Sequence, residues 1–139
     1  MLASSRHLIF HGAIILLFGL LLGAPYAKSI KAGAAAQIVN SWRVAHLSLP
    51  IGAMLMFIVA VLLPSLAVGE SVKWAIAASL MVSAYGFCVS TPLAAITGQR
   101  GLSPGGTGLG KLVYFGNWAG AWGSIVGSVV LLYAAFVSL

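Results

Sequence analysis

The sequence predicts an all-α integral membrane protein, a bundle of four transmembrane helices. The 139 residues are 61% hydrophobic and only 6% charged, and the mean hydropathy of +1.10 is typical of a membrane protein. Four apolar stretches are each long enough to cross a hydrocarbon layer of ~30 Å, which takes ~20 residues of helix. Strands of a membrane barrel would be about half as long and would alternate in polarity. Too little chain remains for a soluble domain, so we expect a single domain over residues 1–139.

The first expected helix covers about Leu8–Ala24. A cleaved signal peptide is the alternative interpretation, but Pro25 suits cleavage poorly, so we expect the helix to be retained. His7 and His11 are four residues apart and therefore share one face at its start. They could bind a metal, but two ligands make an incomplete site, and a surface pair is the plainer interpretation.

The second expected helix, Val44–Val68, contains the most informative residue of the chain, His46. The sequence has a single acidic residue, Glu70, and three histidines. An ionisable side chain in hydrocarbon is costly and usually marks function, although an interfacial histidine bonded to water is the plainer alternative. Because the second helix begins on the other side of the membrane, we expect ~30 Å between His46 and His11. That separation disfavours a cofactor held by both histidines.

The third and fourth helices are expected at Trp74–Ile96 and Leu112–Val137. The glycine-rich segment 100–111 between them lacks the order of a phosphate-binding loop, so we expect a flexible or tightly turned connection. Glycines recur at four-residue spacing, which lets helix backbones approach closely in lipid. These pairs predict tight packing within the bundle, between protomers, or both; they are Gly19 with Gly23, Gly116 with Gly120, and Gly123 with Gly127.

The net charge of +6 comes from cations that flank the helices, so it reflects topology and lipid headgroups rather than nucleic-acid binding. If the helices alternate, the first and third loops share the more basic face, which favours the cytoplasm for them. The cations on that face are Lys28, Lys31, Arg43, Arg100 and Lys111. Without Asp and with one Glu, the chain cannot form a carboxylate pair, a Ser-His-Asp triad or a carboxylate-rich metal site.

Polar and aromatic residues are expected to gather at the depth of His46. The two arginines among them could pair with haem propionates, and an aromatic environment around one histidine is typical of a haem pocket. The alternative is that the aromatic residues form an interfacial belt and the arginines reach the headgroups. The candidates are Trp42, Arg43, Arg100, Tyr114 and Asn117.

Four short motifs occur along the chain: Phe10-His11-Gly12, Ser41-Trp42-Arg43-Val44-Ala45-His46, Leu63-Pro64-Ser65-Leu66 and Gln99-Arg100-Gly101-Leu102-Ser103. In order and approximate spacing they resemble the bacterial styrene oxide isomerases, as do the length and helix pattern. The resemblance implies a trimeric enzyme of the bacterial inner membrane, with haem b bound near protomer boundaries through one histidine, here His46. It also implies that ferric haem acts as a Lewis acid on an epoxide, which rearranges to an aldehyde by a 1,2-hydride shift without net redox change.

The chain departs from the family at the residues that orient the substrate, an asparagine after the haem histidine and a tyrosine on the third helix. Gly52 lies six residues after His46, and Cys88 lies near the tyrosine position. The candidate catalytic residues are therefore Asn117, Tyr114 and Tyr85.

Three functions remain open. The first is a haem-b isomerase for a small apolar epoxide, most simply an oligomer, because four helices of this size cannot easily enclose a haem. The second is a haem-binding sensor or electron carrier without isomerase activity. The third is a membrane scaffold or accessory subunit without haem.

Overall fold

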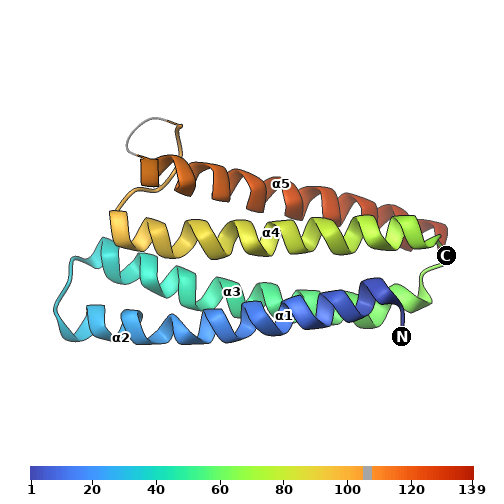
Figure 1. Cartoon of the computed structure of the whole chain (residues 1–139), viewed down its shortest axis with the longest axis horizontal. Helices are drawn as coiled ribbons and strands as arrows, with labels where there is room; N and C mark the ends of the chain where they lie inside the picture. Colours follow the sequence, from blue (N-terminus) through green and yellow to red (C-terminus); the bar gives the residue numbers. More distant parts are fainter. Residues whose placement is uncertain (105–107) are drawn as a thin grey trace.

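The computed structural model describes residues 1–104 and 108–139 and is helical along nearly all of this length (Figure 1). Within this part of the chain, four helical segments are long and apolar enough to cross a membrane, at 3–31, 36–65, 70–97 and 108–137. The predicted all-helical, multi-pass membrane fold is thus confirmed. The elements are α1 (Ala3–Leu21), α2 (Gly23–Lys31), α3 (Ala36–Leu62), the short 3-10 helix η1 (Leu63–Ser65), α4 (Glu70–Thr97) and α5 (Gly108–Val137).

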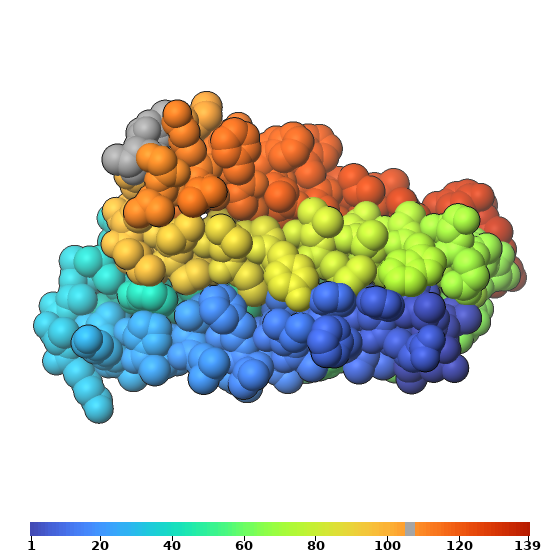
Figure 2. Space-filling model, viewed as in Figure 1, coloured from blue at the N-terminus to red at the C-terminus, as the bar shows by residue number. Residues whose placement is uncertain are grey.

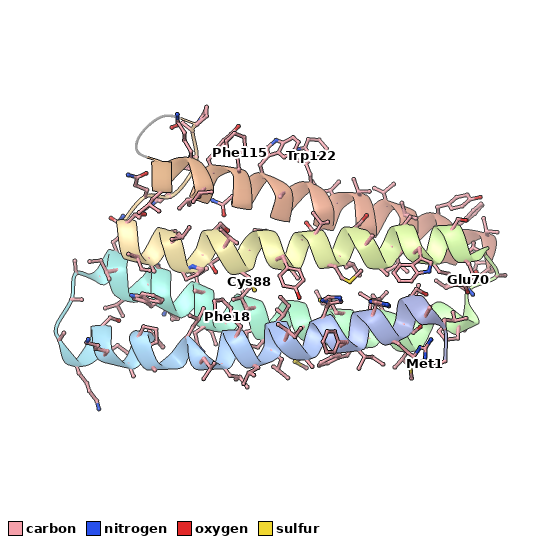
Figure 3. All side chains as sticks on the ribbon, in the orientation of Figure 1. Met1, Phe18, Glu70, Cys88, Phe115 and Trp122 are labelled. Carbon is pink, nitrogen blue, oxygen red and sulfur yellow. The ribbon has the colours of Figure 1, made fainter. Side chains whose placement is uncertain are left out.

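Helices α1, α3 and α4 enclose the core, and α5 packs along the outer side of α4 (Figure 1). Leu8 and Ile15 of α1, Met56 of α3 and Ile76 of α4 are almost completely buried and belong to one apolar cluster. The space-filling view shows α1 and α4 in contact along much of their length (Figure 2). Aromatic side chains of α5 such as Trp122 point away from α4 (Figure 3), on a surface that a bilayer would cover.

The helices at the first connection are longer than predicted. The segment 25–43 was expected to be a loop, but α2 and the first turns of α3 occupy most of it. Its alanine, lysine and glutamine residues are good helix formers even where they are too polar for hydrocarbon. Helix α1 breaks at Leu22 because Pro25 has no amide hydrogen for the carbonyl of Leu21. Helix α3 ends at Leu62 rather than at Val68, since Pro64 follows.

The glycines of α5 make its contact with α4. A Cβ atom on Gly86 of α4 would lie 2.7 Å from both the carbonyl oxygen of Gly116 and the amide nitrogen of Gly120. A Cβ atom on Gly123 would lie 2.8 Å from the amide nitrogen of Ser83. The Ser83 hydroxyl also donates to the carbonyl of Gly120 over 2.7 Å. These glycine pairs therefore serve packing within the bundle, the first of the two roles expected for them.

Alanine at position 86 is expected to destabilise the fold. The added methyl group would meet backbone atoms of α5, which cannot move aside as a side chain can, and such overpacking costs about 1–3 kcal/mol. Unfolding in detergent, followed by circular dichroism, measures the loss. The matched control is Gly52→Ala in α3, where a Cβ atom would meet nothing within 4 Å. Equal stabilities of the two variants would contradict the inferred helix contact.

Candidate functional site around His46

His46 is held by a hydrogen bond to the backbone of a neighbouring helix. Its Nδ1 atom lies 2.9 Å from the carbonyl oxygen of Gly19 in α1, and its side chain is partly buried. A carbonyl oxygen only accepts hydrogen bonds, so Nδ1 carries the hydrogen and Nε2 keeps its lone pair. Histidines that bind metals usually show this arrangement, with one ring nitrogen fixed by a carbonyl and the other on the metal.

Two glycines of the first membrane segment make room for the His46 ring. Gly19 lies in the last turn of α1, where carbonyl groups run out of donors within the helix. A Cβ atom there would lie 2.5 Å from Cδ of Pro50, so only glycine allows α1 and α3 to approach this closely. A Cβ atom on Gly23 would lie 3.0 Å from Cε1, 3.4 Å from Nδ1 and 3.5 Å from Nε2 of His46. Gly23 thus lets the helix backbone pack closely against the Cε1 edge of the ring.

The predicted distance of ~30 Å between His46 and His11 is wrong. His46 bonds to Gly19, which lies eight residues after His11 in the same helix, a rise of only ~12 Å. The error arises because α3 begins at Ala36, ten residues before His46, rather than at Val44. His46 therefore lies well inside the bundle. The two histidines nevertheless have separate partners, since His11 bonds to Tyr85.

A hollow of about 480 Å³, which His46 itself does not line, begins one turn from His46, between α2 and α3. The Tyr26 ring borders it and also faces the His46 ring, with centroids 6.1 Å apart and planes tilted by 31°. Arg43 borders the hollow as well and donates a hydrogen bond to Oδ1 of Asn40. Trp42 is half-buried and packs against the apolar core. Of the expected cofactor-binding residues, Trp42 and Arg43 thus lie within about a turn of His46.

Arg100 and Asn117 lie on a different side of α3. They border a second hollow of about 420 Å³, and the Asn117 amide donates to the Arg100 carbonyl over 3.1 Å. Gln37 and Asn40 line both hollows, so the two hollows adjoin. Gln37, Ser41 and Val44 lie on the side of α3 opposite His46, which lines neither hollow. The remaining lining residues are Thr91 and Ala94.

The other two candidate catalytic residues are also separated from His46. Tyr114 is half-buried in α5 and packs edge-on against Phe115, with ring centroids 5.4 Å apart. The Tyr85 hydroxyl lies 2.8 Å from Nδ1 of His11. Within one chain, the structure thus groups His46 with Arg43 and Trp42, and not with the three candidate catalytic residues.

Sequence reasoning missed an apolar pocket of about 230 Å³ between α3 and α4, which we call the Gly52 pocket. Gly52, Met56 and Phe87 line it, and hydroxyl groups come from one serine on each of three helices. No spacing rule marks these serines, because they meet only when the helices pack. The serines are Ser48, Ser83 and Ser124. Cys88 is half-buried and packs against the core beside Phe87.

The fold and the site define a small multi-pass membrane protein with a histidine, His46, inside its helix bundle and held through Nδ1 by a backbone carbonyl. A sequence model of the styrene oxide isomerase family matches residues 4–136, nearly the whole chain. The chain belongs to this family, and the resemblance inferred from its motifs is confirmed. Among curated proteins, none matches the chain significantly.

Proposed function

We propose that this protein is a haem-b-dependent membrane isomerase that rearranges a small apolar epoxide to a carbonyl compound. The observation that carries the proposal is the hydrogen bond from Nδ1 of His46 to the Gly19 carbonyl, which leaves Nε2 available to haem iron. Membership of the styrene oxide isomerase family supports isomerase chemistry. Substrate and product are isomers, so the reaction needs no electron donor. A Lewis acid activates the epoxide without a carboxylate, which suits a chain with one acidic residue.

The residues around His46 fit a haem group. His46 would supply the iron ligand, and the Arg43 guanidinium, one turn away, would pair with a propionate. Gly23 lets α2 pack against the His46 ring without a clash, and Tyr26 supplies an aromatic wall. The bound haem would supply a Lewis acid for the epoxide oxygen.

The chain's own residues would orient the ligand and exclude water. The Gly19 carbonyl fixes the tautomer and the orientation of the His46 ring and raises the basicity of Nε2. The Gly52 pocket is apolar apart from its serine hydroxyls, so it suits a small apolar substrate and keeps water from a carbocation-like intermediate. Asn117 remains our candidate for a substrate-facing amide, because it borders the second hollow.

A homo-oligomer, trimeric as the family resemblance implies, would bring residues from the two sides of α3 together in one active site. Arg100 and Asn117 face away from His46 in one chain, and so does the Gly52 pocket. A neighbouring copy could present these surfaces to the open side of His46. We therefore propose that each active site combines His46 of one copy with polar and apolar groups of the next, in the bacterial inner membrane.

An epoxide assay on the purified protein tests the proposed reaction. The protein is expressed with added haem, purified in detergent and incubated with styrene oxide under air. We expect phenylacetaldehyde as the product, and a lower rate after reduction to the ferrous state, because a ferrous ion is a weaker Lewis acid. A colourless protein after haem supplementation would overturn the proposal and favour a scaffold without haem.

A haem-binding sensor or electron carrier is the second candidate. The observation that favours it is Gly52, which occupies the place of the asparagine in the family and has no side chain to hydrogen-bond a substrate. This candidate predicts a Soret band and reversible binding of a small gas, but no turnover of any epoxide tested. The assay above thus separates the two functions in one preparation.

A further inference from the structure

A second histidine cluster lies near the start of α1, on the side that faces α4. The rings of His7 and His11 are almost parallel, with centroids 5.9 Å apart and planes 19° apart. Two imidazoles that bind one ion at the usual nitrogen–metal distance of ~2.0–2.1 Å have ring centroids no more than about 6 Å apart. The pair therefore lies at the upper end of the spacing that a chelating site allows, and the rings must turn so that one nitrogen of each points at the ion.

Helix α4 holds both rings in place. Nδ1 of His11 lies 2.8 Å from the Tyr85 hydroxyl, which can accept its hydrogen and so leave Nε2 for a metal. The His7 ring packs against Trp74, with centroids 5.2 Å apart. His7 is exposed and borders, with Arg6 and Phe10, a surface hollow of about 300 Å³ that the half-buried His11 does not line. Both imidazoles are thus oriented by neighbours, and an ion reaches the pair from the His7 side.

We propose that His7 and His11 bind one divalent transition-metal ion of the Zn²⁺ or Ni²⁺ type, at a site distinct from His46. Imidazole suits these ions better than Mg²⁺ or Ca²⁺, which prefer oxygen ligands. No group of three or more His, Cys, Asp or Glu side chains gathers anywhere in residues 1–104 or 108–139. The site therefore has two protein ligands, with water in the other positions, and the ion exchanges readily.

The local side-chain charges mostly oppose a bound cation, so the imidazoles must supply the affinity. Arg6 precedes His7 and borders the same hollow, and Lys73 precedes Trp74 in α4. Glu70, the only acidic side chain of the sequence, lies one turn before Trp74, on the same face of that helix. Figure 3 shows Glu70 at the same end of the bundle as Met1, and therefore at the end where the histidine pair lies. Its charge partly offsets the repulsion from the two cations.

Calorimetric titration with Zn²⁺ or Ni²⁺ alone, on the untagged full-length protein in detergent, tests this site. We expect one ion per chain, and a loss of at least about tenfold in affinity in His7→Gln and in His11→Gln. Tyr85→Phe removes only the hydrogen-bond partner of His11 and is expected to lower the affinity for the metal about 10–100-fold, as for other outer partners of metal ligands. The metal is also expected to raise the melting temperature of the wild-type protein, because it binds the folded state.

Two controls separate this site from the His46 site. Arg6→Gln changes a neighbouring cation and is expected to keep or increase the affinity for metal, whereas His46→Gln removes a histidine elsewhere and is expected to leave it unchanged. Wild-type affinity in the His7→Gln/His11→Gln double variant, or the absence of binding to the wild type, would overturn the proposal. Circular dichroism of each variant shows whether a loss of binding reflects unfolding.

Discussion

Replacement of His46 by alanine is expected to abolish the Soret band of the purified protein and its epoxide turnover. His46 offers the only partly buried imidazole whose Nδ1 is held by a backbone carbonyl among the residues described, so no other side chain can supply an equivalent iron ligand. Visible absorption spectra of wild type and variant, purified in parallel with added haem, measure the effect. The expected loss of turnover is complete, because the Lewis acid would be missing.

Matched variants distinguish ligand loss from misfolding. His11→Ala removes a histidine of the first membrane segment, whereas His46 belongs to the second. The variant is expected to keep the Soret band, since His11 is bonded to Tyr85 rather than placed beside Gly19. His46→Gly leaves a space that free imidazole can fill, so added imidazole is expected to restore the band. An unchanged Soret band in His46→Ala would refute His46 as the ligand, and with it the proposed site.

Hydropathy predicts the fold because spanning a bilayer requires long, uninterrupted apolar helices, and that requirement is visible in a sequence. The same criterion misplaces helix ends. Lys28 and Lys31 are too polar for hydrocarbon, yet they continue a helix in α2, since helix formation needs no apolar side chains. The burial depth of His46 was underestimated for this reason: the helix that carries it begins at Ala36, before the apolar stretch does.

The composition of the site was harder to predict than the fold. The rarity of ionisable residues directs attention to His46, and the four-residue spacing correctly pairs Trp42 with it on one side of α3. Which helices face His46 depends on packing. Gly19 of α1 and Gly23 of α2 let these two helices approach the ring. Asn117 was expected at a depth in the membrane similar to that of His46. Depth does not determine which way a side chain points, and Asn117 borders the hollow on the other side of α3. The Tyr85–His11 contact joins residues 74 positions apart, so no rule of residue spacing predicts it.

Alanine in place of Gly23 is expected to weaken haem binding while the fold persists. Its Cβ atom would lie 3.0 Å from Cε1 of His46, closer than ordinary van der Waals contact, so the ring or the helix must shift. A shift of the ring lengthens the bond from Nδ1 to the Gly19 carbonyl and turns Nε2 away from its present direction. Loss of such an outer partner typically costs 10–100-fold in metal affinity, so we expect a loss of about this size in haem affinity.

Haem titration of the apoprotein, followed at the Soret band, measures this loss, and leucine at position 23 is expected to enlarge it. Gly69→Ala provides the matched control, because a methyl group there meets nothing within 4 Å and Gly69 lies outside the proposed site. Equal haem affinity in Gly23→Ala, Gly23→Leu and wild type would show that the position of the His46 ring does not govern haem binding. A loss confined to the Gly23 variants would show that haem affinity depends on that position, because the added side chain meets the ring at its Cε1 edge.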